Sequence, residues 1–132
     1  MPLYLELAPQ ARQDIDDAIL WLKALDSTAA TRFTDALTEA LATLAVRLQE
    51  QLEEHAPLPI DEDASLALSR PILKHLFFTG KTRQRRSSAG VWRLYFDLRD
   101  NDQDGKPDTL RVVTIRHGAA APLWNPRDQD QE

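Results

Sequence analysis

The clearest pattern in the chain is the segment Val91-Trp92-Arg93-Leu94-Tyr95-Phe96-Asp97-Leu98-Arg99. Its side chains alternate between two faces, which is the period of a β-strand. One face is apolar and the other is mostly polar, so we expect a strand with one face in the core. The apolar face carries Trp92, Leu94, Phe96 and Leu98, and the opposite face carries Val91, Arg93, Tyr95, Asp97 and Arg99.

Three other segments have the composition of strands. Residues Lys74–Lys81 are rich in aromatic side chains, and Leu110–His117 follow a loop with a second apolar run. Near the N-terminus, Leu3, Leu5 and Leu7 alternate with polar or amphipathic neighbours, which predicts a short strand. The three C-terminal strands are close in sequence, so we expect them to form an antiparallel meander.

Apolar residues recur every three or four positions between the first strand and this meander, which predicts helices. The first helix should begin at Pro9 and end near Leu25, and Asp26, Ser27 and Thr28 can cap a second one. So short a link predicts an antiparallel helix hairpin, and the fold class is α+β, with one sheet packed on the helices. The helix residues expected to pack against Trp92, Leu94 and Phe96 are Ile15, Ile19, Leu22, Phe33, Leu37, Leu41 and Leu44.

The remaining organisation is simple. Residues 53–73 hold Pro57, Pro59 and Pro71 and are expected to form a loop or a short irregular connection. A chain of 132 residues fits one domain, which we place at residues 1–124, followed by a polar tail at residues 125–132.

Composition excludes several classes of protein. No apolar run approaches the roughly 20 residues of a membrane span, and the N-terminus lacks a signal-peptide pattern, so a cytoplasmic protein with no membrane partner is expected. Without cysteine there are no disulfides and no thiol nucleophiles. His55, His75 and His117 are scattered, so we expect no metal and no cofactor.

Charge is unevenly distributed along the chain. The net charge is −5, yet residues 70–99 contain 8 basic side chains and 1 acidic one. A basic element on an acidic body can meet a polyanion locally, because salt screens the distant negative charge. The same arginines could instead pair with the acidic helices or cover a solvated face.

Three features of the chain are informative together: the order of its elements, the run Arg86-Ser87-Ser88-Ala89-Gly90-Val91-Trp92-Arg93-Leu94-Tyr95, and the ending Val112-Val113-Thr114-Ile115-Arg116-His117-Gly118. In these features the chain resembles the RelE/ParE toxin superfamily. The resemblance spans roughly residues 3 to 124. It implies the toxin of a type II toxin–antitoxin system, with an antitoxin as partner. RelE-like members cut messenger RNA on the ribosome, whereas ParE-like members poison DNA gyrase and cut nothing themselves.

The resemblance also implies a site. Arg93 matches an arginine that contacts the scissile phosphate in RNA-cleaving members, although it could also pair with Asp97. The lysines on the preceding strand of those members are matched only loosely here, by Lys81, Arg83 and Arg85, because Ala89 lengthens the turn. Arg86 matches a basic position before that turn.

The C-terminal part departs from the RNA-cleaving pattern. Gly118 and Trp124 lie near the positions of an arginine and a tyrosine in those members. Trp124 can stack on a base but cannot donate a catalytic proton. His117 is the expected replacement as acid or base, although a histidine at a strand end is more often structural. Tyr95 and Arg116 complete the expected target-binding surface, with packing as the alternative role for Tyr95.

Residues Asp100–Gly105 repeat the first half of a calcium loop. Arg111 occupies the position of the bidentate glutamate, and strands are expected on both sides. We therefore expect a plain hairpin loop.

Three functions stay open on the sequence. The first is a metal-independent endoribonuclease acting on ribosome-bound mRNA, through Arg93, His117, Arg83 and Arg85. The second is a gyrase inhibitor without catalytic activity, and the third is a silent module that binds an antitoxin or DNA.

Overall fold

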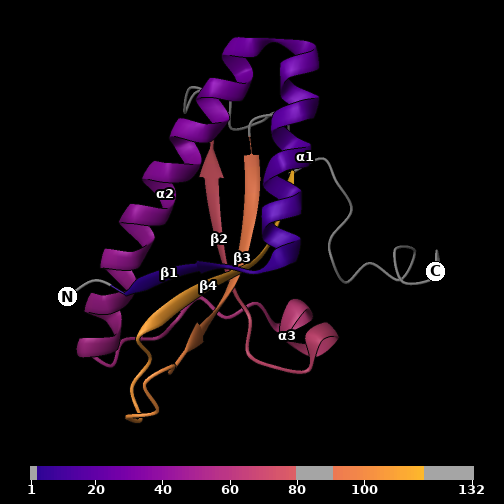
Figure 1. Ribbon diagram of the computed structural model, residues 1–132. Coiled ribbons are helices and arrows are strands. Elements are labelled where there is room, and N and C mark those ends of the chain that lie inside the picture. Colours follow the sequence, from indigo (N-terminus) through magenta and orange to yellow (C-terminus); the bar gives the residue numbers. More distant parts are fainter. Residues whose placement is uncertain (1–2, 80–90, 118–132) are drawn as a thin grey trace.

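A computed structural model describes residues 3–79 and 91–117, which form three helices and one four-stranded sheet (Figure 1). None of the helices in these two ranges is long and apolar enough to cross a membrane. The elements are β1 (Tyr4–Leu7), α1 (Pro9–Leu25), α2 (Ser27–Glu53), α3 (Glu62–Leu68), β2 (Leu73–Phe78), β3 (Val91–Arg99) and β4 (Thr109–His117).

The strands lie in the order β1-β4-β3-β2. The pairs β2–β3 and β3–β4 are antiparallel, as the predicted meander requires, and β1 joins the far edge parallel to β4. Opposite β3 the register steps from Thr114 to Val112, which leaves Val113 as the extra residue of a β-bulge. The predicted α+β class and single sheet are confirmed.

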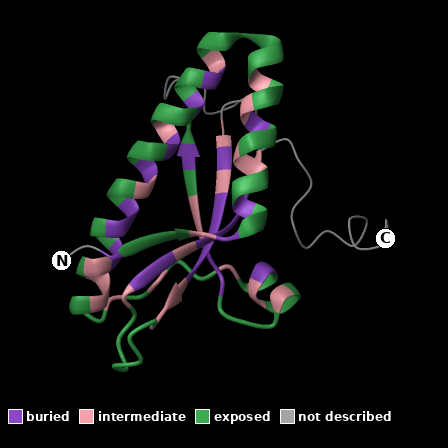
Figure 2. Ribbon diagram, viewed as in Figure 1, coloured by how far each residue is buried: buried purple, intermediate pink, exposed green. Residues whose placement is uncertain are grey.

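Both long helices cover one face of this sheet. Figure 2 shows buried residues on the inner sides of α1 and α2 and along the strands beneath them. Phe33, Leu37 and Leu44 are buried in one cluster with the apolar face of β3, and Ile15, Ile19, Leu22 and Leu41 pack against that cluster. The predicted helix–sheet contact is therefore confirmed residue by residue.

The two helices are joined through one residue, Asp26. It ends α1, and its side chain accepts a hydrogen bond from the Thr28 backbone N–H at 3.0 Å, which caps α2. Pro9 lies in the first turn of α1, where its missing N–H costs nothing. The expected starts of both helices are observed.

The second face of the sheet carries α3. This helix was not predicted, because residues 53–73 were expected to form a loop or a short irregular connection. Asp61 caps α3 by accepting from the Ala64 N–H at 2.9 Å, and the helix ends at Ser69 in the left-handed conformation (φ 58°). Ala64 packs in a small second core that also contains Ile72, Tyr95, Val113 and Leu68. The α3 side of the sheet is therefore partly covered.

Beyond the end of β1, helix α1 protects the open edge of β4. The carboxylate of Asp14 accepts hydrogen bonds from the Ile115 backbone N–H, at 3.0 Å, and from the Thr114 hydroxyl. The helix hairpin is thus tied to the sheet by polar contacts as well as by its apolar face.

Candidate functional site

The candidate site lies at the end of the sheet where β2 ends, β3 begins and β4 ends. Arg93 of β3 lies directly opposite Arg116 of β4, and both are half-buried. An Nη atom of Arg93 donates a hydrogen bond to the His117 carbonyl oxygen at 3.0 Å. Asp97 does not pair with Arg93; it forms its ion pairs with Arg70 and Arg99. Two adjacent guanidinium groups favour an anion or an acidic partner in front of them.

Tyr95 is on the same face of β3 but lies beneath α3. Its exposed fraction is 0%, and it packs in the second core with Ala64 and Val113. Burial raises the pKa of the Tyr95 hydroxyl, the charge of Arg93 opposes this rise, and Asp61 adds to it. Tyr95 therefore stays protonated at neutral pH and is shielded from solvent by α3.

His117 points to the other side of the sheet. Its ring makes edge contacts with Trp92 and Trp21, with centroids 4.8 and 5.2 Å away. Trp92 belongs to the core beneath the helices, and Trp21 lies on α1. The His117 ring and the Arg93 side chain are thus on opposite faces. Neighbouring residues of a strand point to opposite faces, and this was the sequence signal that His117 and Arg116 could not share a face.

Several expected site residues lie outside the described residues. These are Lys81, Arg83, Arg85, Arg86 and Trp124. In the sequence, the first four lie between β2 and β3. The last residue of β2, Phe78, pairs with the first residue of β3, Val91, next to Arg93.

The acidic loop uses its carboxylates to shape the β3–β4 turn. Asp100 accepts hydrogen bonds from the backbone N–H groups of Asp104, at 3.1 Å, and Gly105, at 2.7 Å. Asp108 accepts from the N–H groups of Asn101 and Asp102 and from the Thr109 hydroxyl, and this last bond is the main cause of its lowered pKa. Within residues 3–79 and 91–117, no group of three His, Cys, Asp or Glu side chains could hold a metal ion.

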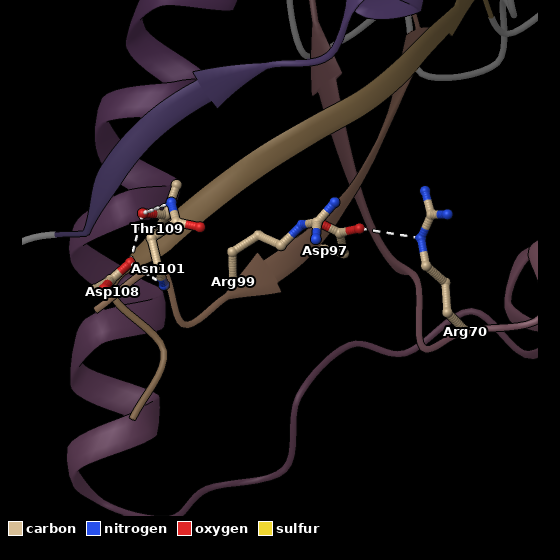
Figure 3. A network of polar contacts seen from close by, with 6 residues as sticks. All are labelled: Arg70, Asp97, Arg99, Asn101, Asp108 and Thr109. Atoms are coloured by element: carbon tan, nitrogen blue, oxygen red, sulfur yellow. Dashed lines mark hydrogen bonds and ion pairs between the residues drawn. The ribbon is translucent and has the colours of Figure 1, made fainter. Parts of the chain in front are cut away.

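Sequence reasoning missed a second polar cluster on the α3 side of the sheet, in which Arg70 and Arg99 flank Asp97 (Figure 3). The sequence signal for this cluster was Asp97, the single acidic residue on the polar face of a strand that carries arginines. Its main partner, Arg70, lies in the stretch expected to be irregular.

Residues 5–122 match the protein family described as "ParE toxin of type II toxin-antitoxin system, parDE". The chain belongs to this family. The match covers most of the chain, so the resemblance to RelE/ParE toxins is confirmed. The ParE-family chain is therefore the toxin of a type II toxin–antitoxin system, and an antitoxin is its partner. No curated protein matches it.

Proposed function

We propose that this ParE-family toxin inhibits growth by binding DNA gyrase and has no catalytic activity of its own. The observation that carries the proposal is the placement of His117 and Arg93 on opposite faces of the sheet. Cleavage of RNA needs a proton-transfer group and a phosphate-binding cation around the same reacting atoms. Tyr95, the other titratable candidate, is buried under α3.

The surface around Arg93 has the character of a protein-binding patch. On β2, Leu76 lies opposite Arg93 and Phe78 lies opposite Val91. Both β2 side chains are exposed, at 43% and 44%, although they are large and apolar. An exposed aromatic residue beside arginines is typical of the residues that dominate protein–protein binding. This patch therefore supports a protein target.

Ribosome-dependent mRNA cleavage is the second candidate, and the Arg93–Arg116 pair favours it. Two guanidinium groups on adjacent strands can hold a phosphate by charge-assisted hydrogen bonds. In this case the proton donor and further cations would come from outside the described residues, where Arg83, Arg85 and Trp124 lie.

The two candidates are separated by purified components. The toxin is added to gyrase with relaxed plasmid DNA and ATP, and separately to programmed ribosomes with a labelled mRNA. We expect inhibited or trapped gyrase and intact mRNA. Cleaved mRNA with unaffected gyrase would establish the second candidate and refute the first.

A variant pair tests the patch itself. Phe78→Ser removes its aromatic side chain and should weaken gyrase inhibition strongly. Tyr4→Ser is the matched control, because Tyr4 is also an exposed aromatic residue but lies on β1, at the opposite edge of the sheet. Equal inhibition by the two variants would show that the Phe78 patch does not contact gyrase.

A further inference from the structure

A second cationic cluster lies on the α3 side of the sheet, toward the other end of β3 from Arg93. Asp97 is only 5% exposed, and its Oδ2 accepts a hydrogen bond from Arg70 Nε at 3.1 Å. Arg99 Nε lies 3.7 Å from Oδ1, and Figure 3 shows the two arginines reaching Asp97 from opposite sides. Arg111 lies directly opposite Asp97 on β4. Two guanidinium groups therefore contact one carboxylate, and a third arginine lies opposite it on the neighbouring strand.

This cluster has unmet hydrogen bonds as well as excess positive charge. Within the two described ranges, the buried atoms Asp97 Oδ1, Arg99 Nε and Arg111 Nε have no hydrogen-bond partner. Glu6 of β1 lies opposite Arg111 of β4 but forms no ion pair with it. Leaving such groups unsatisfied costs free energy, and Arg99, which lines the cavity described next, could donate to an incoming carboxylate.

An apolar cavity of about 300 Å³ adjoins the cluster. Its walls come from the connection before β2, from β2 itself and from the end of β3. The apolar residues that line it are Leu58, Ile60, Pro71, Leu73 and Leu98, and the charged ones are Arg70, Asp97 and Arg99. The cavity thus offers an apolar wall directly beside guanidinium groups.

We propose that this cavity binds an acidic peptide segment of a partner protein. An aliphatic side chain of the segment enters the cavity, and a neighbouring carboxylate is held by Arg70 and Arg99. The side chains of these arginines are 41% and 43% exposed, so they can turn toward an incoming carboxylate without unfolding the site.

The chemistry of the cavity favours a peptide over other anionic ligands. Its volume is at the lower limit for small-molecule pockets, but it accommodates one aliphatic side chain. A nucleic-acid backbone would leave the apolar wall of the cavity unused. The cavity contains none of the residues at the Arg93 end, so acidic-peptide binding there is independent of whether gyrase or mRNA is the toxin's target.

The test is a titration of the full-length toxin, labelled with ¹⁵N, by NMR of the arginine Nε–Hε groups. The probe is the capped peptide Gly-Leu-Glu-Leu-Asp-Gly, and the matched probe carries Gln and Asn in place of Glu and Asp. We expect the acidic peptide to shift the Nε–Hε resonances of Arg70 and Arg99, with a Kd at least about tenfold lower than that of the neutral peptide, because charge-assisted hydrogen bonds are the stronger ones.

Variants assign the site. Arg99→Gln should weaken binding of the acidic peptide about tenfold, whereas Arg32→Gln removes an exposed cation of α2 that does not line the cavity and should leave the binding unchanged. If the melting temperature shows that Arg99→Gln is unfolded, Arg70→Gln replaces it. Equal affinity for the two peptides, equal binding by the Arg99 and Arg32 variants, or the same shifts with inorganic phosphate at the same concentration would each overturn the proposal.

Discussion

Replacing Asp14 with alanine should weaken the attachment of the helix hairpin to the sheet more than replacing any other polar residue of α1. The Asp14 carboxylate is the acceptor for two groups of β4, the Ile115 backbone N–H and the Thr114 hydroxyl. Ile115 and Thr114 are 4% and 1% exposed, so water cannot readily replace the lost acceptor. Asp14→Ala therefore leaves a buried N–H group without a partner.

The size of the effect follows from these two bonds. An unsatisfied buried donor costs about 1–3 kcal/mol, and the hydroxyl of Thr114 adds less because it can rotate toward another acceptor. We expect the free energy of unfolding to fall by about 2–4 kcal/mol in total. Asp14→Asn keeps an acceptor oxygen and loses only the charge, so its cost should be about 1 kcal/mol.

Urea unfolding followed by circular dichroism measures these differences. Asp17→Ala is the matched control, because Asp17 is an exposed residue of the same helix whose carboxylate, among the described residues, accepts only from Gln13, at 2.8 Å. Its cost should stay within about 0.5 kcal/mol. If Asp14→Ala and Asp17→Ala unfold at the same urea concentration, the Asp14 contacts do not stabilise the fold and the reasoning is refuted.

Three other outcomes are expected. Leu94→Ala opens a cavity beneath the helices and should cost about 2–5 kcal/mol in urea unfolding, and a loss under about 1 kcal/mol would contradict the core described above. Arg93→Ala should abolish growth inhibition, scored by colony counts after induction, with little change in melting temperature; undiminished toxicity would remove the Arg93 surface from the mechanism. Burial raises the pKa of Tyr95, so the folded state holds this proton more tightly than the unfolded state does. Its contribution to stability is complete below about pH 10 and is lost as the pH rises through the folded-state pKa, and a Tyr95→Phe variant with the same alkaline unfolding profile would argue against it.

The main architecture could be predicted because it depends on local periodicity. Alternation along residues 91–99 and the three-to-four spacing through Phe33 and Leu37 each identify one buried face, and one face per element is enough to dock a helix hairpin on a sheet. The helix start at Asp26 was equally local, since a side-chain cap reaches only two or three residues ahead.

The candidate site was harder to predict because it depends on register and on long-range packing. The bulge at Val113 sets which β4 residue lies opposite Arg93, and nothing in the local sequence fixes that step. Helix α3 is too short to show a period, so the burial of Tyr95 beneath it could not be anticipated. The partners of Asp97 likewise come from two separate parts of the chain.

The parallel pairing of β1 with β4 has a consequence for the order of events during synthesis. The register joins Tyr4 to Thr109, so the first strand made must wait for the last one before it can enter the sheet. At about 5–20 residues per second, this delay lasts roughly 5–20 s for each nascent chain. The hairpin of α1 and α2 needs only contacts close in sequence and can form on the ribosome well before the sheet closes. A newly made toxin therefore passes through a stage in which its helices are present and its complete sheet is not.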